Sequence, residues 1–203
     1  MDFFEKIIYL LPSILIALTV HEFFHGWTAW QFGDPTAKYE NRLTLNPIVH
    51  LDPYGAAMML ITALWGFPMG WAKPVPVVRE RLTNPKISLP LVALAGPVSN
   101  LILAFLTGRL LNFGLGNVPF LTKFLLFFCM VNIGLACFNM LPIPPLDGWK
   151  IIQIFLPDNL SYRANYFVAS NPKVAYGMLL FVVLFSGSIM SIPCTFLFRL
   201  FTG

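Results

Sequence analysis

The chain has 203 residues, of which 57% are hydrophobic and 11% are charged, and its mean hydropathy is +0.73. Soluble domains average about 25% charged residues, so this chain has too few charges to solvate a globular surface. The net charge of +4 is small and does not indicate a nucleic-acid partner. The composition predicts a single domain over residues 1–203 that is an all-α, polytopic membrane protein in contact with the lipid bilayer.

Four segments are long and apolar enough to cross a bilayer, which takes about 20 residues. They are residues 7–32, 87–112, 119–141 and 174–200. The first has an acidic flank and no small-residue cleavage site, so we expect a retained span and not a signal peptide. A fifth apolar stretch, 54–68, is shorter and ends in WGFPMGW, which suits a re-entrant or interfacial segment.

Basic residues predict the topology. Six of them lie between the first two full spans: Lys38, Arg42, Lys73, Arg79, Arg81 and Lys86. If 54–68 enters the membrane and returns, all six share one face, and the positive-inside rule makes that face cytoplasmic. We therefore expect the N-terminus and the 112–118 connection outside, and residues 142–173 inside.

Residues 33–86 are rich in Pro, Asn, Gly and Asp, which are typical of turns and extended backbone. In KPVPVV, residues 73–78, alternating prolines push their neighbours to extended geometry, so the segment cannot be helical. The sequence predicts a small strand region here, associated with the membrane surface.

The stretch LTVHEFFHGW, residues 18–27, places two histidines and a glutamate inside the first apolar span. A charged side chain at the centre of a membrane helix costs roughly 2.5–3.5 kcal/mol, so such residues persist where they pair or bind something. His21 and His25 are one helical turn apart, so both rings project from one face and can ligate one ion. Glu22 points about 100° around the helix, where it can take a proton from a metal-bound water. The HExxH pattern therefore predicts a metal site with Glu22 as general base.

A catalytic zinc site takes three protein ligands and a water, so one ligand must come from elsewhere in the chain. The stretch NMLPIPPLDGWK, residues 139–150, follows a long apolar span. Its prolines forbid a regular helix, and Gly148 frees the turn after Asp147. The pattern predicts a rigid connection that presents the Asp147 carboxylate at membrane depth.

Two alternatives to this third ligand stay open. Asp147 is also a good N-cap for a helix over 148–156. His50, in NPIVHLDP, is a rival ligand, although an interfacial loop histidine is the more ordinary interpretation. Asp34 and Asp52 stand next to prolines and are interpreted as turn residues.

HEFFH in a first span, ALAGPVSN in a later one and NMLPIPPLDG after the next resemble the motifs of the site-2 protease family of intramembrane zinc metalloproteases. The stretches RLTLNPIVHLDPYG and GWAKPVPV are similar to its compact, mostly prokaryotic subgroup, which lacks PDZ and CBS domains. The core motifs cover residues 18–150, and the span 174–200 lies beyond them.

The resemblance implies a core of three helices that holds one Zn²⁺ ion, with His21, His25 and Asp147 as ligands. It implies a hydrolase of a prokaryotic cytoplasmic membrane, with Glu22 as general base acting on zinc-bound water. The topology predicted from the basic residues places the active site toward the cytoplasm. Asn139 matches the asparagine of the family motif, so its amide is expected to be a catalytic group that hydrogen-bonds the substrate carbonyl or the oxyanion. The alternative for Asn139 is a polar contact between helices.

Asn100 ends the ALAGPVSN motif, and we expect its amide to bind the substrate carbonyl or to make a polar contact between helices. Gly96 and Pro97 are expected to permit close helix packing or a kink.

A membrane helix hides its carbonyls in i→i−4 hydrogen bonds, so a substrate must unwind locally before it is cleaved. We expect single-pass membrane proteins as substrates, added as a strand along Pro74, Val75, Pro76 and Val77. Two alternative functions stay open. One is a metal-ion transporter that uses the histidines, and the other is a catalytically silent homologue that binds membrane helices.

Overall fold

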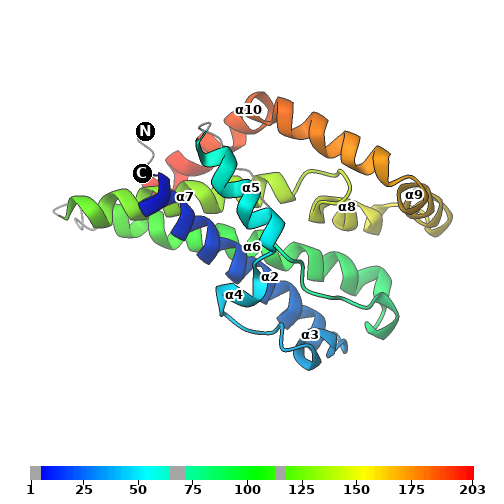
Figure 1. The fold of residues 1–203 in the computed structure, drawn as a ribbon. Coiled ribbons are helices and arrows are strands. Elements are labelled where there is room, and N and C mark those ends of the chain that lie inside the picture. The colour runs from blue at the N-terminus through cyan, green and yellow to red at the C-terminus, as the bar shows by residue number, and fades with distance from the viewer. Residues whose placement is uncertain (1–5, 65–71, 113–117) are drawn as a thin grey trace.

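The computed structural model describes residues 6–64, 72–112 and 118–203 (Figure 1). Within these ranges the chain is helical and contains no β-strand. The elements are η1 (Lys6–Leu10), α2 (Leu11–Gln31), α3 (Thr36–Tyr39), α4 (Pro47–His50), α5 (Pro53–Leu64), η2 (Arg79–Arg81), α6 (Pro85–Asn112), α7 (Pro119–Asn139), α8 (Asp147–Ile152), η4 (Gln153–Phe155), α9 (Asp158–Ser170) and α10 (Pro172–Thr202).

Three helices among the described residues are long and apolar enough to cross a membrane: Ile7–Gln31, Pro85–Asn112 and Pro119–Asn139. They correspond to η1 with α2, to α6 and to α7. Each of α2, α6 and α7 packs against the other two, so they form a three-helix core (Figure 1). The chain is an all-α integral membrane protein, which confirms the predicted fold class.

The last two apolar segments are only partly tested by the structure. The predicted span 174–200 falls in α10, whose described residues contain a shorter apolar stretch, Ile189–Thr202. A full crossing by α10 stays a prediction. The segment 54–68 begins in α5, whose 12 residues extend about 18 Å at 1.5 Å per residue, too short for a bilayer core of about 30 Å. The rest of that segment lies outside the described residues.

The predicted strand region is wrong in one respect. Residues 73–78 are extended, as the alternating prolines require, but within the described residues they belong to no sheet. Strand-type pairing among the described residues is limited to one isolated antiparallel bridge, between Leu51 and Ala72. Prolines at positions 74 and 76 lack the N–H groups that a ladder needs, so side chains, not a partner strand, satisfy much of this backbone.

Glycine and proline set the ends of the core helices. Helix α2 ends at Gln31 because Gly33 adopts a positive φ of 99° and Pro35 follows it. Proline begins both α6 and α7, and the three prolines after Asn139 prevent α7 from continuing. The last of these breaks ends α7, and the non-helical connection that carries Asp147 begins there.

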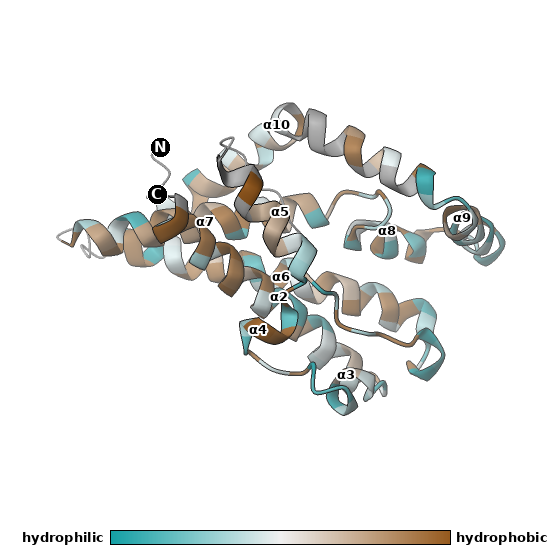
Figure 2. Cartoon of the chain, viewed as in Figure 1, coloured by the Kyte–Doolittle hydropathy of each residue, from teal (hydrophilic) through white to brown (hydrophobic). Residues whose placement is uncertain are grey.

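Hydropathy is distributed unevenly along the bundle. Figure 2 shows hydrophilic residues on α3, around the start of α6 and on α9, whereas the core helices are mainly hydrophobic. The hydrophilic segments carry many of the basic residues from which the topology was predicted. Their grouping is compatible with a common aqueous face.

The end of α10 packs closely against α6. Phe201 and the neighbouring turn cover Ala104, Cys129 and Ile133. A Cβ atom added at Gly108 would lie 2.8 Å from the carbonyl oxygen of Phe201. Such a contact requires backbone movement, so the glycine permits this helix pair to meet.

We expect Gly108→Ala to lower the thermal unfolding midpoint in detergent by an amount equivalent to about 1–3 kcal/mol, because overpacking displaces α10 from α6. Gly134→Ala is the matched control, since a Cβ atom at Gly134 has no neighbour within 4 Å. The control should leave the midpoint unchanged or raise it slightly. Equal midpoints for the two variants would contradict the packing described here.

Candidate metal centre

The two histidines of α2 are buried, and each is held through its Nδ1 atom. His21 Nδ1 lies 2.6 Å from Asn100 Oδ1, and His25 Nδ1 lies 2.7 Å from the carbonyl oxygen of Val92. Both acceptors take an N–H, so each imidazole donates from Nδ1 and keeps an Nε2 lone pair for a ligand. Fixing the ring and tautomer in this way is the usual support of a metal-binding histidine.

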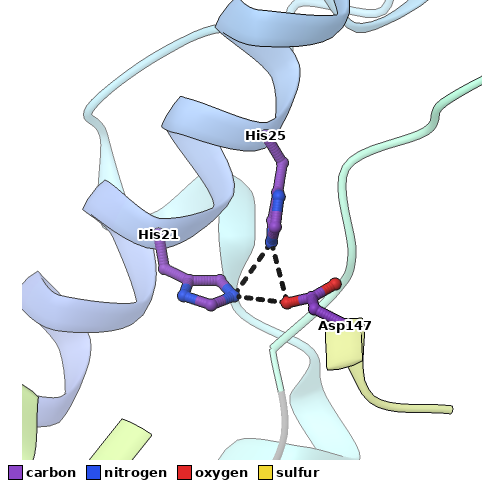
Figure 3. Close-up of side chains that lie close together, drawn as sticks. All are labelled: His21, His25 and Asp147. Carbon is purple, nitrogen blue, oxygen red and sulfur yellow. Dashed lines mark hydrogen bonds and ion pairs between the residues drawn. The ribbon is translucent and has the colours of Figure 1, made fainter. Parts of the chain in front are cut away.

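Asp147 brings a carboxylate to the same point from a distant part of the chain. Its Oδ2 lies 3.2 Å from His21 Nε2 and 3.1 Å from His25 Nε2, and the two Nε2 atoms are 2.9 Å apart (Figure 3). Ligands about 2.0–2.1 Å from a tetrahedral zinc ion lie about 3.3 Å from one another. The three donor atoms therefore have separations close to those of a zinc tripod.

The donor set fits zinc chemically. Imidazole nitrogen and carboxylate oxygen are both common zinc ligands. All three residues are buried, and they are the candidate metal group found within the described residues. Three protein ligands leave a coordination position for water or substrate, which distinguishes a catalytic site from a closed structural one.

The Glu22 side chain lines the same cavity as the tripod. This cavity has a volume of about 350 Å³ and is lined by His21, His25, Asp147 and Glu22, among others. Glu22 Oε2 accepts a hydrogen bond of 2.8 Å from the backbone N–H of Val75. The carboxylate is thus beside the tripod without belonging to it, as expected for a general base.

The Asp147 carboxyl is ionised although it is buried. Burial alone raises the pKa of this carboxyl, but the adjoining His21 and His25 side chains and the nearby charge of Lys150 outweigh burial and hold the pKa below its usual range. Lys150 Nζ donates to the second carboxylate oxygen, Oδ1, at 3.2 Å. Oδ2 is thereby left to face the histidines.

Two glycines allow the three ligands to converge. A Cβ atom at Gly96 of α6 would contact His25 Nε2 and lie 2.7 Å from His21 Cε1, so both rings rest on the glycine backbone. A Cβ atom at Gly148 would contact the carbonyl oxygens of Met140 and Leu141. The first glycine gives the rings their space, and the second closes the turn that presents Asp147.

The alternatives to the third ligand are wrong. The N-cap of α8 is Leu146, and Asp147 is its first residue, with the carboxylate directed to the histidines and not to a cap. His50 is buried elsewhere, and its Nε2 donates to the carbonyl oxygen of Thr44 at 2.8 Å. His50 therefore does not join the tripod.

Asn100 does not lie where a substrate-binding residue must lie. It is fully buried, and its Nδ2 donates to Asn132 Oδ1 at 2.8 Å and to the carbonyl of Ala17 at 3.2 Å. Its Oδ1 holds His21. Asn100 thus makes the polar contact between helices that was the alternative expectation, and we infer that it positions the His21 ring and does not contact the substrate. Asn132, which the sequence analysis missed, was detectable as a polar residue inside the apolar span 119–141.

The other predicted residues lie along the cavity. Asn139 lines it and donates to the carbonyl oxygen of Leu135 at 3.0 Å, which leaves a second amide N–H. Pro74, Val75 and Val77 line it too, and Pro76 is placed between them on the same segment. Their roles in catalysis and substrate binding stay predictions.

The extended segment is fastened at both ends by buried charged residues. Arg42 Nη2 donates to the carbonyl oxygen of Lys73 at 2.7 Å, and Asp34 Oδ2 accepts from the backbone N–H of Val78 at 2.6 Å. Asp34 is thus more than the turn residue that was predicted. With Glu22 bound to Val75 between them, these side chains hold the segment along the cavity.

Membrane-spanning helices that enclose a His–His–Asp tripod with a glutamate beside it define a membrane metalloenzyme. The model of peptidase family M50 matches residues 116–184 of the chain. No solved structure matches it.

Curated relatives extend the similarity over most of the chain. It is 42% identical over 185 residues to "Putative zinc metalloprotease YwhC" of Bacillus subtilis, which covers 87% of this chain and 80% of that protein. It is 33% identical over 183 residues to "Putative zinc metalloprotease Rip2" of Mycolicibacterium smegmatis, with 87% and 66% covered. The chain belongs to peptidase family M50, the site-2 protease family, and is a zinc metalloprotease.

We expect Gly96→Ala to weaken zinc binding strongly, because its methyl group occupies the space of the His25 ring. The measurement is zinc affinity by competition with a chelator, in detergent. Gly134→Ala should bind zinc like the wild type. Unchanged affinity in Gly96→Ala would mean that the rings do not rest on α6 as described.

Asn100→Ala should lower zinc affinity by roughly 10–100-fold, the usual effect of removing the partner of a metal-binding histidine. The same competition assay checks this, with the exposed Asn159→Ala as the matched control. Wild-type zinc affinity combined with impaired substrate binding would restore the original substrate role of Asn100.

Proposed function

We propose that this protease cleaves peptide bonds within the membrane segments of single-pass membrane proteins, and so performs regulated intramembrane proteolysis. One observation carries the proposal: the tripod and Glu22 open together onto a cavity among helices that are built to span a bilayer. Peptide segments that already lie in the membrane reach this cavity most readily. The zinc metalloprotease family of the chain supplies the matching chemistry.

His21, His25 and Asp147 would hold the zinc ion. When bound, zinc lowers the pKa of a coordinated water toward about 7 and polarises a carbonyl group. Glu22 takes the proton of the attacking water on its carboxylate and later gives it to the leaving amine. Its hydrogen bond from Val75 keeps the carboxylate oriented toward the cavity.

Asn139 is our candidate for stabilising the charge that develops on the substrate oxygen. It lies at the end of α7, lines the cavity and has an amide N–H to donate. A donor that is fixed before the reaction stabilises a developing oxyanion without reorganisation. Its backbone connects directly to the proline-rich segment that presents Asp147.

A helical substrate must expose its backbone before hydrolysis. We propose that an unwound stretch lies beside residues 74–77 in extended form, as strand addition does in other peptide-binding sites. Support comes from the geometry of this segment, which is extended, lines the cavity and is fastened by Asp34 and Arg42. Substrates with helix-destabilising residues in their spans would unwind most readily.

We also propose the orientation in the membrane: a prokaryotic cytoplasmic membrane, with the N-terminus outside and the active site toward the cytoplasm. The basic residues of the hydrophilic segments support this, because cytoplasmic loops are enriched in Lys and Arg. It places the connection that carries Asp147 on the cytoplasmic side, where water reaches the site.

The experiment is cleavage of a labelled single-pass substrate by the wild type and by Glu22→Gln, reconstituted in vesicles. We expect Glu22→Gln to retain one bound zinc ion and to lose cleavage by more than about 100-fold, since general-base catalysis contributes roughly 10²–10⁴ in rate.

Cleavage by Glu22→Gln at the wild-type rate would overturn the mechanism. Failure of the wild type to cleave membrane segments while it cleaves soluble peptides would overturn the proposed substrate class. Bound helix with no cleavage by either protein would indicate a silent homologue.

A further inference from the structure

A second cavity adjoins the metal cavity at the hydrophilic end of the bundle. It has a volume of about 250 Å³ and lies between the start of α6 and the α8–α9 region. Leu89 and Lys150 line both cavities, so the two cavities are direct neighbours.

The lining of the second cavity carries more positive than negative charge. Arg79, Lys86 and Lys150 line it with one carboxylate, Asp158, and Lys150 is also paired with Asp147 Oδ1 at 3.2 Å. The Asp158 carboxylate is already bound to Lys86, at 2.8 Å. The N-terminus of α6 adds partial positive charge at the same wall. Arg79, which is exposed, has no ion pair within the described part of the chain.

The extended segment leads from one cavity to the other. Val75 and Val77 line the metal cavity, and Arg79 lines the second. Arg79 follows Val77 by two residues and begins η2, so this short stretch connects the linings of the two cavities. At about 3.3 Å per residue, Arg79 lies roughly 7 Å beyond Val77 along the segment. A substrate laid beside Val75 and Val77 would therefore come close to Arg79 within a few residues.

We propose that the second cavity is a specificity subsite for a carboxylate side chain of the substrate, about two to four residues from the scissile bond. This inference rests on the proposed function, since it assumes a peptide in the metal cavity. The positive-inside rule accounts for basic residues on this face, but it requires neither their position in a cavity nor the location of that cavity next to the metal cavity.

The experiment measures binding of fluorescent single-pass peptides to Glu22→Gln protein, which retains the peptide uncleaved, in phosphatidylcholine vesicles. The peptides carry Asp, Asn or Lys at each position two to four residues on either side of the cleavage site. Each is tested with Glu22→Gln alone and with Arg79→Glu or Arg163→Glu added. Arg163 is exposed on α9 and lines neither cavity, so its reversal is the matched control for net charge.

We expect one position in this window at which Asp binds about fivefold tighter than Lys, which corresponds to the upper range for a partly exposed ion pair. Arg79→Glu should reverse that preference, and Arg163→Glu should leave it intact. Zinc content should be equal in all three proteins, which separates charge recognition from damage to the metal centre.

Equal binding of the Asp and Lys peptides, or a preference that Arg79→Glu leaves unchanged, overturns the inference. So does a loss of binding in Arg79→Glu that is the same for every peptide and depends on added phosphatidylglycerol, because the cavity would then hold a lipid headgroup. Parallel cleavage by the wild type tests the proposed function separately. Charge-selective binding without cleavage would refute proteolysis and retain the subsite.

Discussion

The convergence of two imidazole nitrogens and one carboxylate oxygen inside a membrane bundle constrains everything around it. Polar groups at this depth are costly unless they bind a cation or one another. The rings need space, which Gly96 supplies, and fixed tautomers, which Asn100 and the Val92 carbonyl supply. The carboxylate must arrive from a non-helical connection, which is tolerated at membrane depth only where it is buried in protein or lines a wet cavity.

The same constraint joins the proposed catalytic base, Glu22, to the proposed substrate path. Glu22 follows His21 on α2 and holds the Val75 backbone, so one helix turn positions a ligand, the base and the extended segment. Asp34, just beyond the end of α2, holds the far end of that segment. A displacement of α2 would therefore move the tripod and the extended segment together. The two cavities follow this segment from the metal centre to the hydrophilic end of the bundle.

The sequence predicted the tripod because its signals are local. A spacing of four places His21 and His25 on one helix face, and prolines with Gly148 mark a rigid connection around Asp147. For Asn100 the sequence offered a contact between helices but not the His21 partner, because a buried amide finds its partners only when α2, α6 and α7 pack. The prediction of a strand region was wrong for a related reason. The sequence indicates extended backbone, but tertiary contacts decide whether a partner strand or side chains such as Arg42 bind its backbone N–H and C=O groups.

X-ray absorption spectroscopy of the purified, zinc-loaded protein tests the tripod most directly. The structure predicts one zinc per chain, with two imidazole nitrogens at about 2.0–2.1 Å, carboxylate oxygen at about 2.0–2.2 Å and no sulfur ligand. Removing the Asp147 carboxylate should change the oxygen shell and leave both imidazoles. A spectrum with thiolate at about 2.3 Å, or one that does not respond to loss of Asp147, would contradict the tripod.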